Sequence, residues 1–451
     1  MAAVKIADSR FVQKHNANWV SGNNNPAQAG AYVPGDGVIE ERIVHPLRWS
    51  SLISLLLAMF VITVGYGYLL PVLPPMIAQI VGTSDRESLS RHTGMLTGTY
   101  TLALFLFAPL WGRAADRHGR RSVILAGLLG FASTLALFSI ADTLALLYLS
   151  RLLNGLFASA ITPAVYALIG DHAPSKEWRA HRFAMVNIAG ASGFLIGPML
   201  GGLTSLIARE VTPGPSTGIP LQAPSYITAA LALVIALAIW KLVPERVPRA
   251  IDRQAALNPP SNGTVLWRLL AVSFVTALAV GAFEVGLSLL GTQTLGMNIS
   301  QLGLMFMECS LVMLVVQTLV FSPFIKIEFT RWFFAPALAI LASSLAVVPL
   351  AETGVAMAIS VAVVAASAGV LSPIATYWIS LGAGEMQGTR LGWQTAVASL
   401  GQAIGSAAGG LFFDAKVFVN ASFTLTSVVV LVGLLASIGL PRLLVPSHQL
   451  G

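Results

Sequence analysis

Three charged residues, Arg151, Glu284 and Glu308, interrupt stretches of sequence that are otherwise almost free of charge. If these stretches cross a membrane, each charge needs a partner or a water-filled cavity, because an ionisable group is costly in a bilayer. A carboxylate in such a cavity can exchange a proton or attract a cation, so Glu284 and Glu308 are candidates for a proton or substrate site. Each of the two can equally belong to a structural ion pair or lie near the end of a helix.

A second cluster lies between two apolar stretches, in the ten residues Gly112–Arg121. Its candidate functional residues are Gly112, Asp116, Arg117, Gly119, Arg120 and Arg121. Glycines provide backbone freedom and close helix approach, and Asp116 can accept charge-assisted hydrogen bonds or face a helix N-terminus. The arginines alone fit an anchor at the membrane surface equally well, but their order with the glycines and the aspartate favours a latch between two helices.

A third pattern is a ridge of small residues with one proline. It consists of Gly193, Gly197, Pro198, Gly201 and Gly202. Small residues four apart let helices approach closely, and a proline removes a backbone donor and can kink a helix. We favour a hinge or a seal against leakage over ordinary tight packing. Pro71 and Pro74 similarly predict a bend near the outer end of the first apolar segment.

The elements that must position these residues are membrane-spanning helices. Of the 451 residues 55% are hydrophobic and 10% are charged, and the mean hydropathy is +0.77, which is too apolar for an ordinary soluble protein. Charge-free runs of about 20 residues, the length that crosses a bilayer as a helix, recur along the chain. A β-barrel would show shorter segments of alternating polarity. We predict an all-α membrane protein with twelve spans, centred near residues 61, 102, 132, 160, 195, 233, 280, 312, 341, 368, 402 and 430.

The basic residues predict the orientation. With both termini in the cytoplasm, only Arg86, Arg91, Arg209 and Lys416 of the 26 Lys and Arg residues fall outside, and Arg151 lies within a span. This asymmetry follows the positive-inside rule, so we expect a multi-pass protein of the cell (inner) membrane. The net charge of +7 then reflects topology and lipid contact, and gives no support for nucleic-acid binding.

An internal repeat divides the spans into six and six. The glycine spacing of Gly193–Gly202 returns in Gly401–Gly410, 208 residues later. Such duplicated halves around a midplane cavity support alternating access. We expect a cytoplasmic tail over residues 1–48, six-helix halves over residues 49–243 and 266–442, a linker over residues 244–265 and a short tail over residues 443–451.

These motifs resemble those of a known family. The segment Gly112–Arg121 closely resembles the signature loop of the major facilitator superfamily. Segments similar to motifs of its twelve-span drug:proton antiporters are Gly65 with Pro71–Pro74, Arg151–Gly155 and Gly193–Gly202. Asn154 stands where these antiporters usually have Gln, and Ala184 where they have Gly. The resemblance covers residues 50–442 and implies the major facilitator fold, export by exchange and a role for Arg151 in proton transfer.

The resulting functional prediction is a proton-coupled exporter (antiporter) of small amphipathic compounds or drugs, working as a monomer. Many such antiporters have an acidic residue in the first span, and Leu52–Leu70 has none, which leaves open a uniporter or symporter for a sugar, metabolite or siderophore. A non-transporting membrane sensor is a more remote alternative.

No nucleotide loop, nucleophile elbow or metal motif occurs, so we expect no enzyme, metal or cofactor. Several aromatic residues are candidates for lining a cavity or for anchoring at the membrane interface: Tyr66, Tyr68, Tyr166, Tyr377, Trp378 and Trp393.

Overall fold

The structure, a computed structural model, describes residues 46–82, 85–174, 176–211, 219–245, 263–320, 325, 327–381, 387–413 and 421–444. The side chains of some residues within its helices, that of Asp116 among them, are outside this description, as is Gly202 apart from its place in a helix. The predicted tails before residue 46 and after residue 444 and most of the predicted linker also lie outside the described residues.

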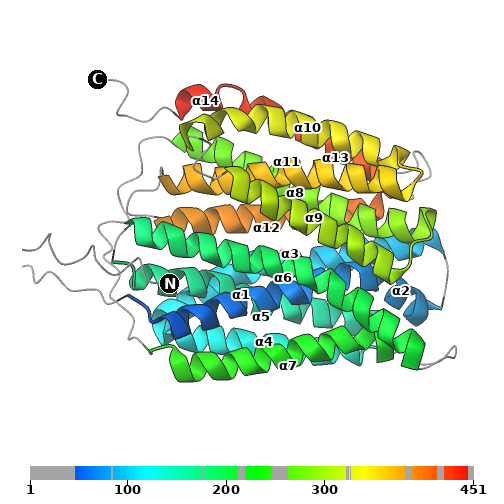
Figure 1. Cartoon of the computed structure of the whole chain (residues 1–451), viewed down its shortest axis with the longest axis horizontal. Coiled ribbons are helices and arrows are strands. Elements are labelled where there is room, and N and C mark those ends of the chain that lie inside the picture. The colour runs from blue at the N-terminus through cyan, green and yellow to red at the C-terminus, as the bar shows by residue number, and fades with distance from the viewer. Residues whose placement is uncertain are drawn as a thin grey trace, which may run out of the picture. The chain divides into compact units, whose positions relative to one another are not determined.

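All regular elements in the described part of the chain are helical (Figure 1). They are α1 (Trp49–Gly67), α2 (Leu69–Val81), α3 (Arg86–His118), α4 (Arg120–Ser139), α5 (Leu144–Asp171), α6 (Lys176–Val211), α7 (Ile219–Leu242), α8 (Gly263–Leu289), a π-helical turn η1 (Leu290–Thr294), α9 (Ile299–Val320), 3₁₀ turns η2 (Ile327–Phe333) and η3 (Val348–Leu350) around α10 (Phe334–Val347), α11 (Gly354–Leu381), α12 (Gln387–Leu411), α13 (Ala421–Ser437) and α14 (Leu440–Leu443). Every predicted span centre falls within one of these helices.

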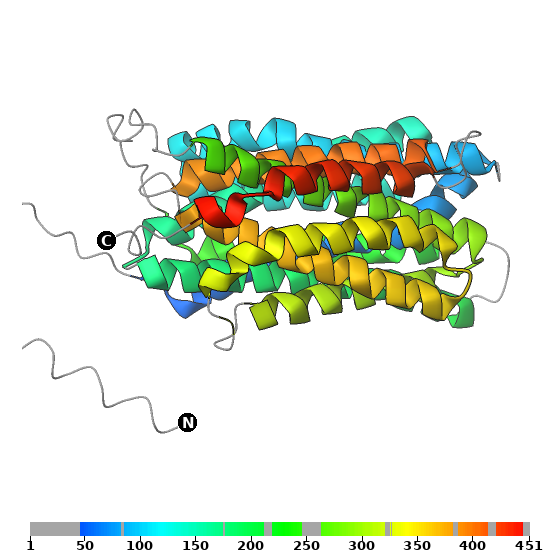
Figure 2. The same ribbon diagram turned by 90° about the horizontal axis from the view of Figure 1, so that it is seen from above.

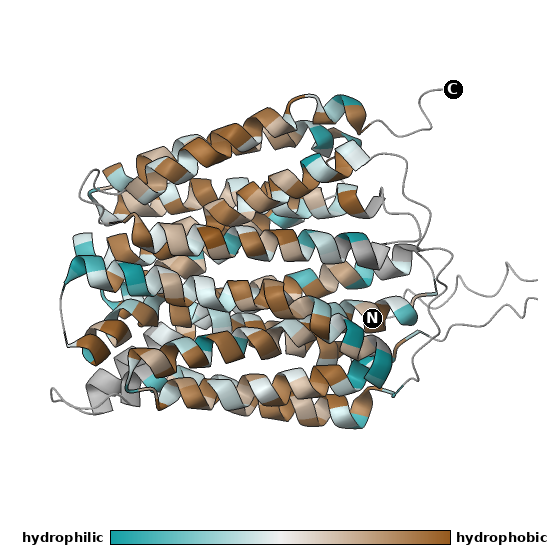
Figure 3. Ribbon diagram, turned by 180° about the vertical axis from the view of Figure 1, so that it is seen from behind, coloured by the Kyte–Doolittle hydropathy of each residue, from teal (hydrophilic) through white to brown (hydrophobic). Residues whose placement is uncertain are grey.

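Eleven segments of the described residues are long and apolar enough to cross a membrane. The first of them, Trp49–Val81, combines α1 and α2. α12, the eleventh span in chain order, brings the number to twelve. It is less apolar than the others because it carries Arg390, Gln394 and Gln402, and it packs between α3 and α8 (Figure 1). Hydrophobic residues run along the helices, and hydrophilic ones gather towards their ends (Figure 3). The predicted all-α, twelve-span fold is confirmed.

α1 begins and α14 ends at the same end of the helix bundle, as an even number of spans requires (Figures 1 and 2). We call this the termini end and the opposite one the far end. α8 begins at Gly263, slightly ahead of the predicted start of the second half at residue 266. The first span is divided into α1 and α2 at Tyr68, one turn before Pro71, because Pro71 has no N–H to offer to the carbonyl group one turn earlier. The bend that we expected near Pro71 and Pro74 remains a prediction.

The glycine ridge of α6 packs against α1, the first helix of its half. A Cβ atom at Gly193 would overlap the carbonyl oxygen of Phe60, and one at Gly197 would lie 2.7 Å from that of Val64. Only a residue without a side chain permits this approach. The structure thus shows tight packing here, and a hinge or a seal remains a prediction.

The ridge of α12 packs in the same way against α8, the first helix of the second half. Cβ atoms at Gly401 and Gly405 would overlap the carbonyl oxygens of Phe274 and Leu278. The sequence repeat therefore corresponds to a repeat in packing, in which the fifth span of each half lies on the first.

The two halves, α1–α7 and α8–α14, meet where α3 packs on α12 and α6 on α9. At Gly94 and Gly410 the backbones approach so closely that a Cβ atom on either would lie 2.6 Å from the Cα atom of the other. Hydrogen bonds also join the halves near the far end. Arg86 donates to the carbonyl oxygen of Gln293 at 2.9 Å, and Ser288 donates to that of Leu70 at 2.8 Å.

Candidate functional site

Glu284 of α8 lies at the boundary between the halves and contacts side chains of α1 and α12. The Tyr66 hydroxyl donates to Glu284 Oε2 at 2.5 Å, and Gln402 Nε2 donates to the same oxygen at 3.2 Å. Gln402 Nε2 also lies 3.1 Å from the Tyr66 hydroxyl oxygen, to which it donates. Glu284 is only 4% exposed. An ionised acceptor strengthens such bonds, and the one from Tyr66 connects the first half to the second.

Gly281 explains why Gln402 reaches this carboxylate. It lies three residues before Glu284 and therefore on the same face of α8. A Cβ atom at Gly281 would lie 2.5 Å from the Gln402 carbonyl oxygen. The absence of a side chain lets α12 approach α8 at this level and brings Gln402 beside Glu284.

Aromatic rings extend the cluster into the first half. The Tyr66 ring stacks on Tyr100 of α3 with centroids 5.3 Å apart, and on Phe194 of α6 with centroids 5.9 Å apart. On Tyr100 lies the guanidinium group of Arg151 from α5, 4.5 Å from the ring centroid. Arg151 and Glu284 are therefore linked through two tyrosines.

Arg151 is 1% exposed, and its Nε donates to the Leu96 carbonyl oxygen at 3.5 Å. Among the described residues, neither terminal nitrogen of its guanidinium group has a hydrogen-bond partner, and no carboxylate forms a salt bridge with it. Its charge is instead balanced in part by the face of Tyr100, a cation–π interaction. The partner that we expected for a charge in the bilayer is thus an aromatic ring.

Tyr66, Glu284 and Gln402 border a cavity of about 360 Å³ between the halves. α6, α9 and α11 complete its wall, and Cys309 of α9 also lines it. Residues nearer the termini end of these helices line it as well, namely Asn187, Gln317 and Thr376. The cavity therefore extends from the central carboxylate towards the termini end, and its size suits a small organic molecule.

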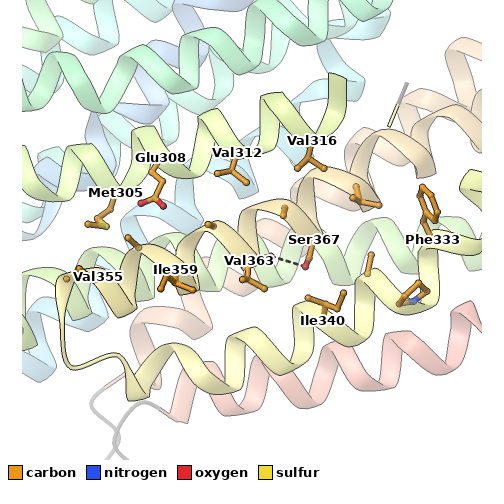
Figure 4. A pocket seen from close by; sticks show the side chains of 17 residues that line it. Met305, Glu308, Val312, Val316, Phe333, Ile340, Val355, Ile359, Val363 and Ser367 are labelled. Atoms are coloured by element: carbon orange, nitrogen blue, oxygen red, sulfur yellow. Dashed lines mark hydrogen bonds between the residues drawn. The ribbon is translucent and has the colours of Figure 1, made fainter. Parts of the chain in front are cut away.

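Glu308, the other candidate carboxylate, does not lie in this cavity. It faces a separate apolar groove formed by α9, α10 and α11 (Figure 4). Cys309, the next residue, faces the central cavity. The rotation of α9 thus separates two carboxylates that the sequence treats alike.

The predicted loop Gly112–Arg121 consists of the last turns of α3, Gly119 and the first two residues of α4, at the termini end. Gly119 has φ +90°, which a residue with a side chain rarely adopts, so the expected backbone freedom is present there. No described atom lies within 4 Å of a Cβ atom built on Gly112, so the expected close helix approach at Gly112 is wrong. Arg117 is exposed, and Asp116 belongs to α3 although its side chain is outside the described residues.

The loop arginines contact other helices of the first half. Arg120 Nε lies 3.6 Å from the Asp171 carboxylate at the end of α5. Arg121 donates to the carbonyl oxygen of Trp240 in α7 and lies 3.8 Å from the Glu245 carboxylate. The described contacts therefore bind the start of α4 to α5 and α7.

Sequence reasoning found part of the central cluster. Of the six aromatic candidates, Tyr66 lines the central cavity, whereas Tyr68 bonds to Ser225 and Trp378 to Thr330 in buried positions. Gln402 and Tyr100 were missed. A polar glutamine within the glycine ridge of the eleventh span was the signal for Gln402.

Comparisons with known proteins agree with this architecture. Residues 55–406 match the sequence profile described as "Major Facilitator Superfamily". The chain is 27% identical over 399 residues to "Multidrug resistance protein 1" of Bacillus subtilis (strain 168), covering 86% of this chain and 95% of that protein. It is 24% identical over 362 residues to "Quinolone resistance protein NorA" of Staphylococcus aureus (strain MSSA476), covering 79% of this chain and 88% of that protein.

Two solved structures share the fold. The human organic anion transporter MFSD10 (TETRAN) matches with a TM-score of 0.65 and 21% identity, covering 86% of this chain and 99% of that one. A bacterial homologue of the human lysosomal transporter Spinster, solved in an inward-facing and occupied conformation, matches with a TM-score of 0.66 and 15% identity. The match covers 87% of this chain and 96% of that one. With its twelve spans, repeated halves and central cavity, the chain is a multi-pass membrane transporter that belongs to the major facilitator superfamily.

Proposed function

We propose that this protein is a proton-coupled exporter of small amphipathic organic compounds. The observation that carries the proposal is the position of Glu284, a buried carboxylate in a cavity between the halves that accepts hydrogen bonds from both. A group in this position can respond to a proton or a ligand and also affect how the halves fit together. Relatives named for multidrug, quinolone and tetracycline resistance support an organic substrate.

Exchange follows if proton and substrate compete for one carboxylate. Ionised Glu284 accepts hydrogen bonds from Tyr66 and Gln402, and it attracts a cationic or polarised group in the cavity. A proton on Glu284 removes that attraction and weakens the bond between the halves. A proton entering from outside would thus release the substrate, and a substrate entering from inside would displace the proton.

The described conformation supports loading from the termini end. Arg86 and Ser288 connect the halves near the far end, while the cavity extends the other way. We propose that the termini end faces the cytoplasm of a cell with the protein in its inner membrane, as the basic residues predict. The transporting unit is then a monomer, with residues 49–243 and 266–442 as its two moving halves.

We propose that Arg151 and the loop Gly112–Arg121 assist transport, Arg151 next to the central site and the loop at the termini end. Arg151 places a fixed positive charge next to the tyrosines that lead to Glu284, which favours release of a proton from this region. Arg120 and Arg121 stiffen the termini end of the first half through α5 and α7. Asp116, on the same loop, would form the latch that opens as the halves move.

The test is transport of rhodamine 6G, a fluorescent organic cation, by everted membrane vesicles with and without an imposed proton gradient. In such vesicles efflux from the cell is measured as uptake into the vesicle. Gradient-driven efflux should fall at least tenfold in Glu284→Gln and should persist in Glu352→Gln, whose carboxylate is exposed. Uptake that ignores the gradient would reject proton coupling. Net import of a sugar or metabolite by proteoliposomes would favour the uniporter or symporter instead.

A further inference from the structure

A second cavity, of about 980 Å³, lies between α9, α10 and α11 (Figure 4). Its walls are apolar except for two side chains, Glu308 and Ser367. The Ser367 hydroxyl donates to the Val363 carbonyl oxygen at 2.9 Å, so its hydrogen-bonding capacity as a donor is used within α11. Glu308 is therefore the one charged group that the described wall of this groove presents.

The Glu308 carboxylate has no counter-charge in the described part of the protein. No hydrogen bond or salt bridge involves it there, and Figure 4 shows it beside Met305 and Val312. It lies near the middle of α9, a membrane span. A charge in such surroundings is costly unless a partner compensates it. A cationic ligand would supply the compensation for an ionised Glu308 that the described part of the chain does not supply.

The groove opens towards the lipid. Three large apolar residues along its border are strongly exposed: Ile340 is 51%, Val355 is 72% and Ile359 is 62% exposed. These residues belong to α10 and α11, which span the membrane, so the surrounding medium is hydrocarbon. A molecule that enters from this side must itself dissolve in the bilayer.

We propose that this groove binds a lipophilic organic cation taken from the bilayer, with Glu308 as its counter-ion. The apolar walls fit the body of such a molecule, and its volume falls in the range of about 300–1,000 Å³ typical of small-molecule sites. A metal ion would require several oxygen ligands, of which this wall offers one carboxylate. The site is separate from the central cavity, and binding there does not require proton coupling.

The two sites share a wall. Adjacent residues of α9 face opposite sides, Val312 the groove and Met313 the central cavity, as do Ser367 and Ala368 of α11. Gly369 lets the helices approach, since a Cβ atom there would lie 3.1 Å from the Met313 Cα atom. A cation in the groove is thus held one helix wall from Glu284.

The experiment uses the full-length protein in phosphatidylcholine nanodiscs and an azide-bearing tetraphenylphosphonium cation as a photolabel. After illumination, mass spectrometry identifies labelled peptides from α9 and α11. A neutral azide-bearing triphenylphosphine oxide measures labelling by apolar contact alone. The variants are Glu308→Gln, Glu308→Asp to keep the charge, and Glu284→Gln to change only the central cavity.

We expect saturable labelling around Glu308 and Val312 by the cation. Glu308→Gln should weaken it at least tenfold, about 1.4 kcal/mol, whereas Glu308→Asp should retain most of it and Glu284→Gln should leave it unchanged. The neutral probe should label wild type and Glu308→Gln alike. Equal cation labelling of wild type and Glu308→Gln would overturn the proposal, because apolar contact alone would then account for the labelling and Glu308 would not be the counter-ion. Loss of this labelling in Glu284→Gln would also overturn it, because the probe would then be in the central cavity.

Discussion

Replacing Tyr66 by Phe tests the bond that joins the two halves at Glu284. The change removes one hydroxyl group and keeps the ring that stacks on Tyr100. Tyr68→Phe is a matched control, because Tyr68 is also buried and its hydroxyl lies 2.7 Å from that of Ser225, within the first half. The two variants differ in whether the lost bond crosses between the halves and involves a charge.

The magnitude follows from the type of bond. A hydrogen bond to a charged group contributes about 1.5–3 kcal/mol, and a neutral one about 0.5–1.5 kcal/mol. If the Tyr66–Glu284 bond forms only when the far end is closed, its loss raises the ratio of open to closed protein about 10- to 150-fold. Tyr68→Phe affects both states similarly, so its ratio should change less than about threefold.

The assay is a distance measurement between spin labels by double electron–electron resonance. Exposed positions Asp142 and Glu352 lie in loops at the far end, one in each half, and are changed to cysteine in a Cys309→Ala background. Tyr66→Phe should increase the population with the longer distance. Equal distance distributions for Tyr66→Phe, Tyr68→Phe and the parent protein would refute the reasoning that this bond helps hold the far end closed.

Three other predictions concern the glycines and the charges. Gly405→Ala should reduce the free energy of unfolding by about 1–3 kcal/mol, because its methyl group would overlap the Leu278 carbonyl oxygen, and this loss should appear as a lower thermal denaturation midpoint in detergent. Gly112→Ala, which has free space around it, should leave the midpoint equal or higher. Equal losses in the two variants would contradict the packing. Asp116→Asn should cut dye efflux without reducing the amount of protein in the membrane, and unchanged efflux would count against the latch. Arg151→Lys should reduce gradient-driven efflux at least tenfold, since the planar group that stacks on a tyrosine is lost; full activity would show that charge alone is sufficient.

Much of the fold could be predicted from single segments. The thickness of the bilayer sets the length of an apolar run, so the twelve spans could be placed without knowledge of their neighbours. The repeated spacing of Gly193–Gly202 and Gly401–Gly410 indicated two halves, because a glycine ridge needs a helix to pack on. The prolines of the first span predicted an irregularity near Pro71, and the helix is divided one turn earlier, at Tyr68, since a proline affects the hydrogen bond to the preceding turn.

The site depended on the rotation of each helix and on which helices meet. The sequence by itself singled out Arg151, Glu284 and Glu308 as charges in apolar spans, because such charges are unusual whatever surrounds them. Only the tertiary structure decided that Glu284 faces the central cavity and Glu308 the lipid-facing groove. It also decided that Tyr66 and Gln402, 336 residues apart, bind the same carboxylate. Contacts between distant spans depend on packing along their whole lengths, which no local pattern of residues specifies.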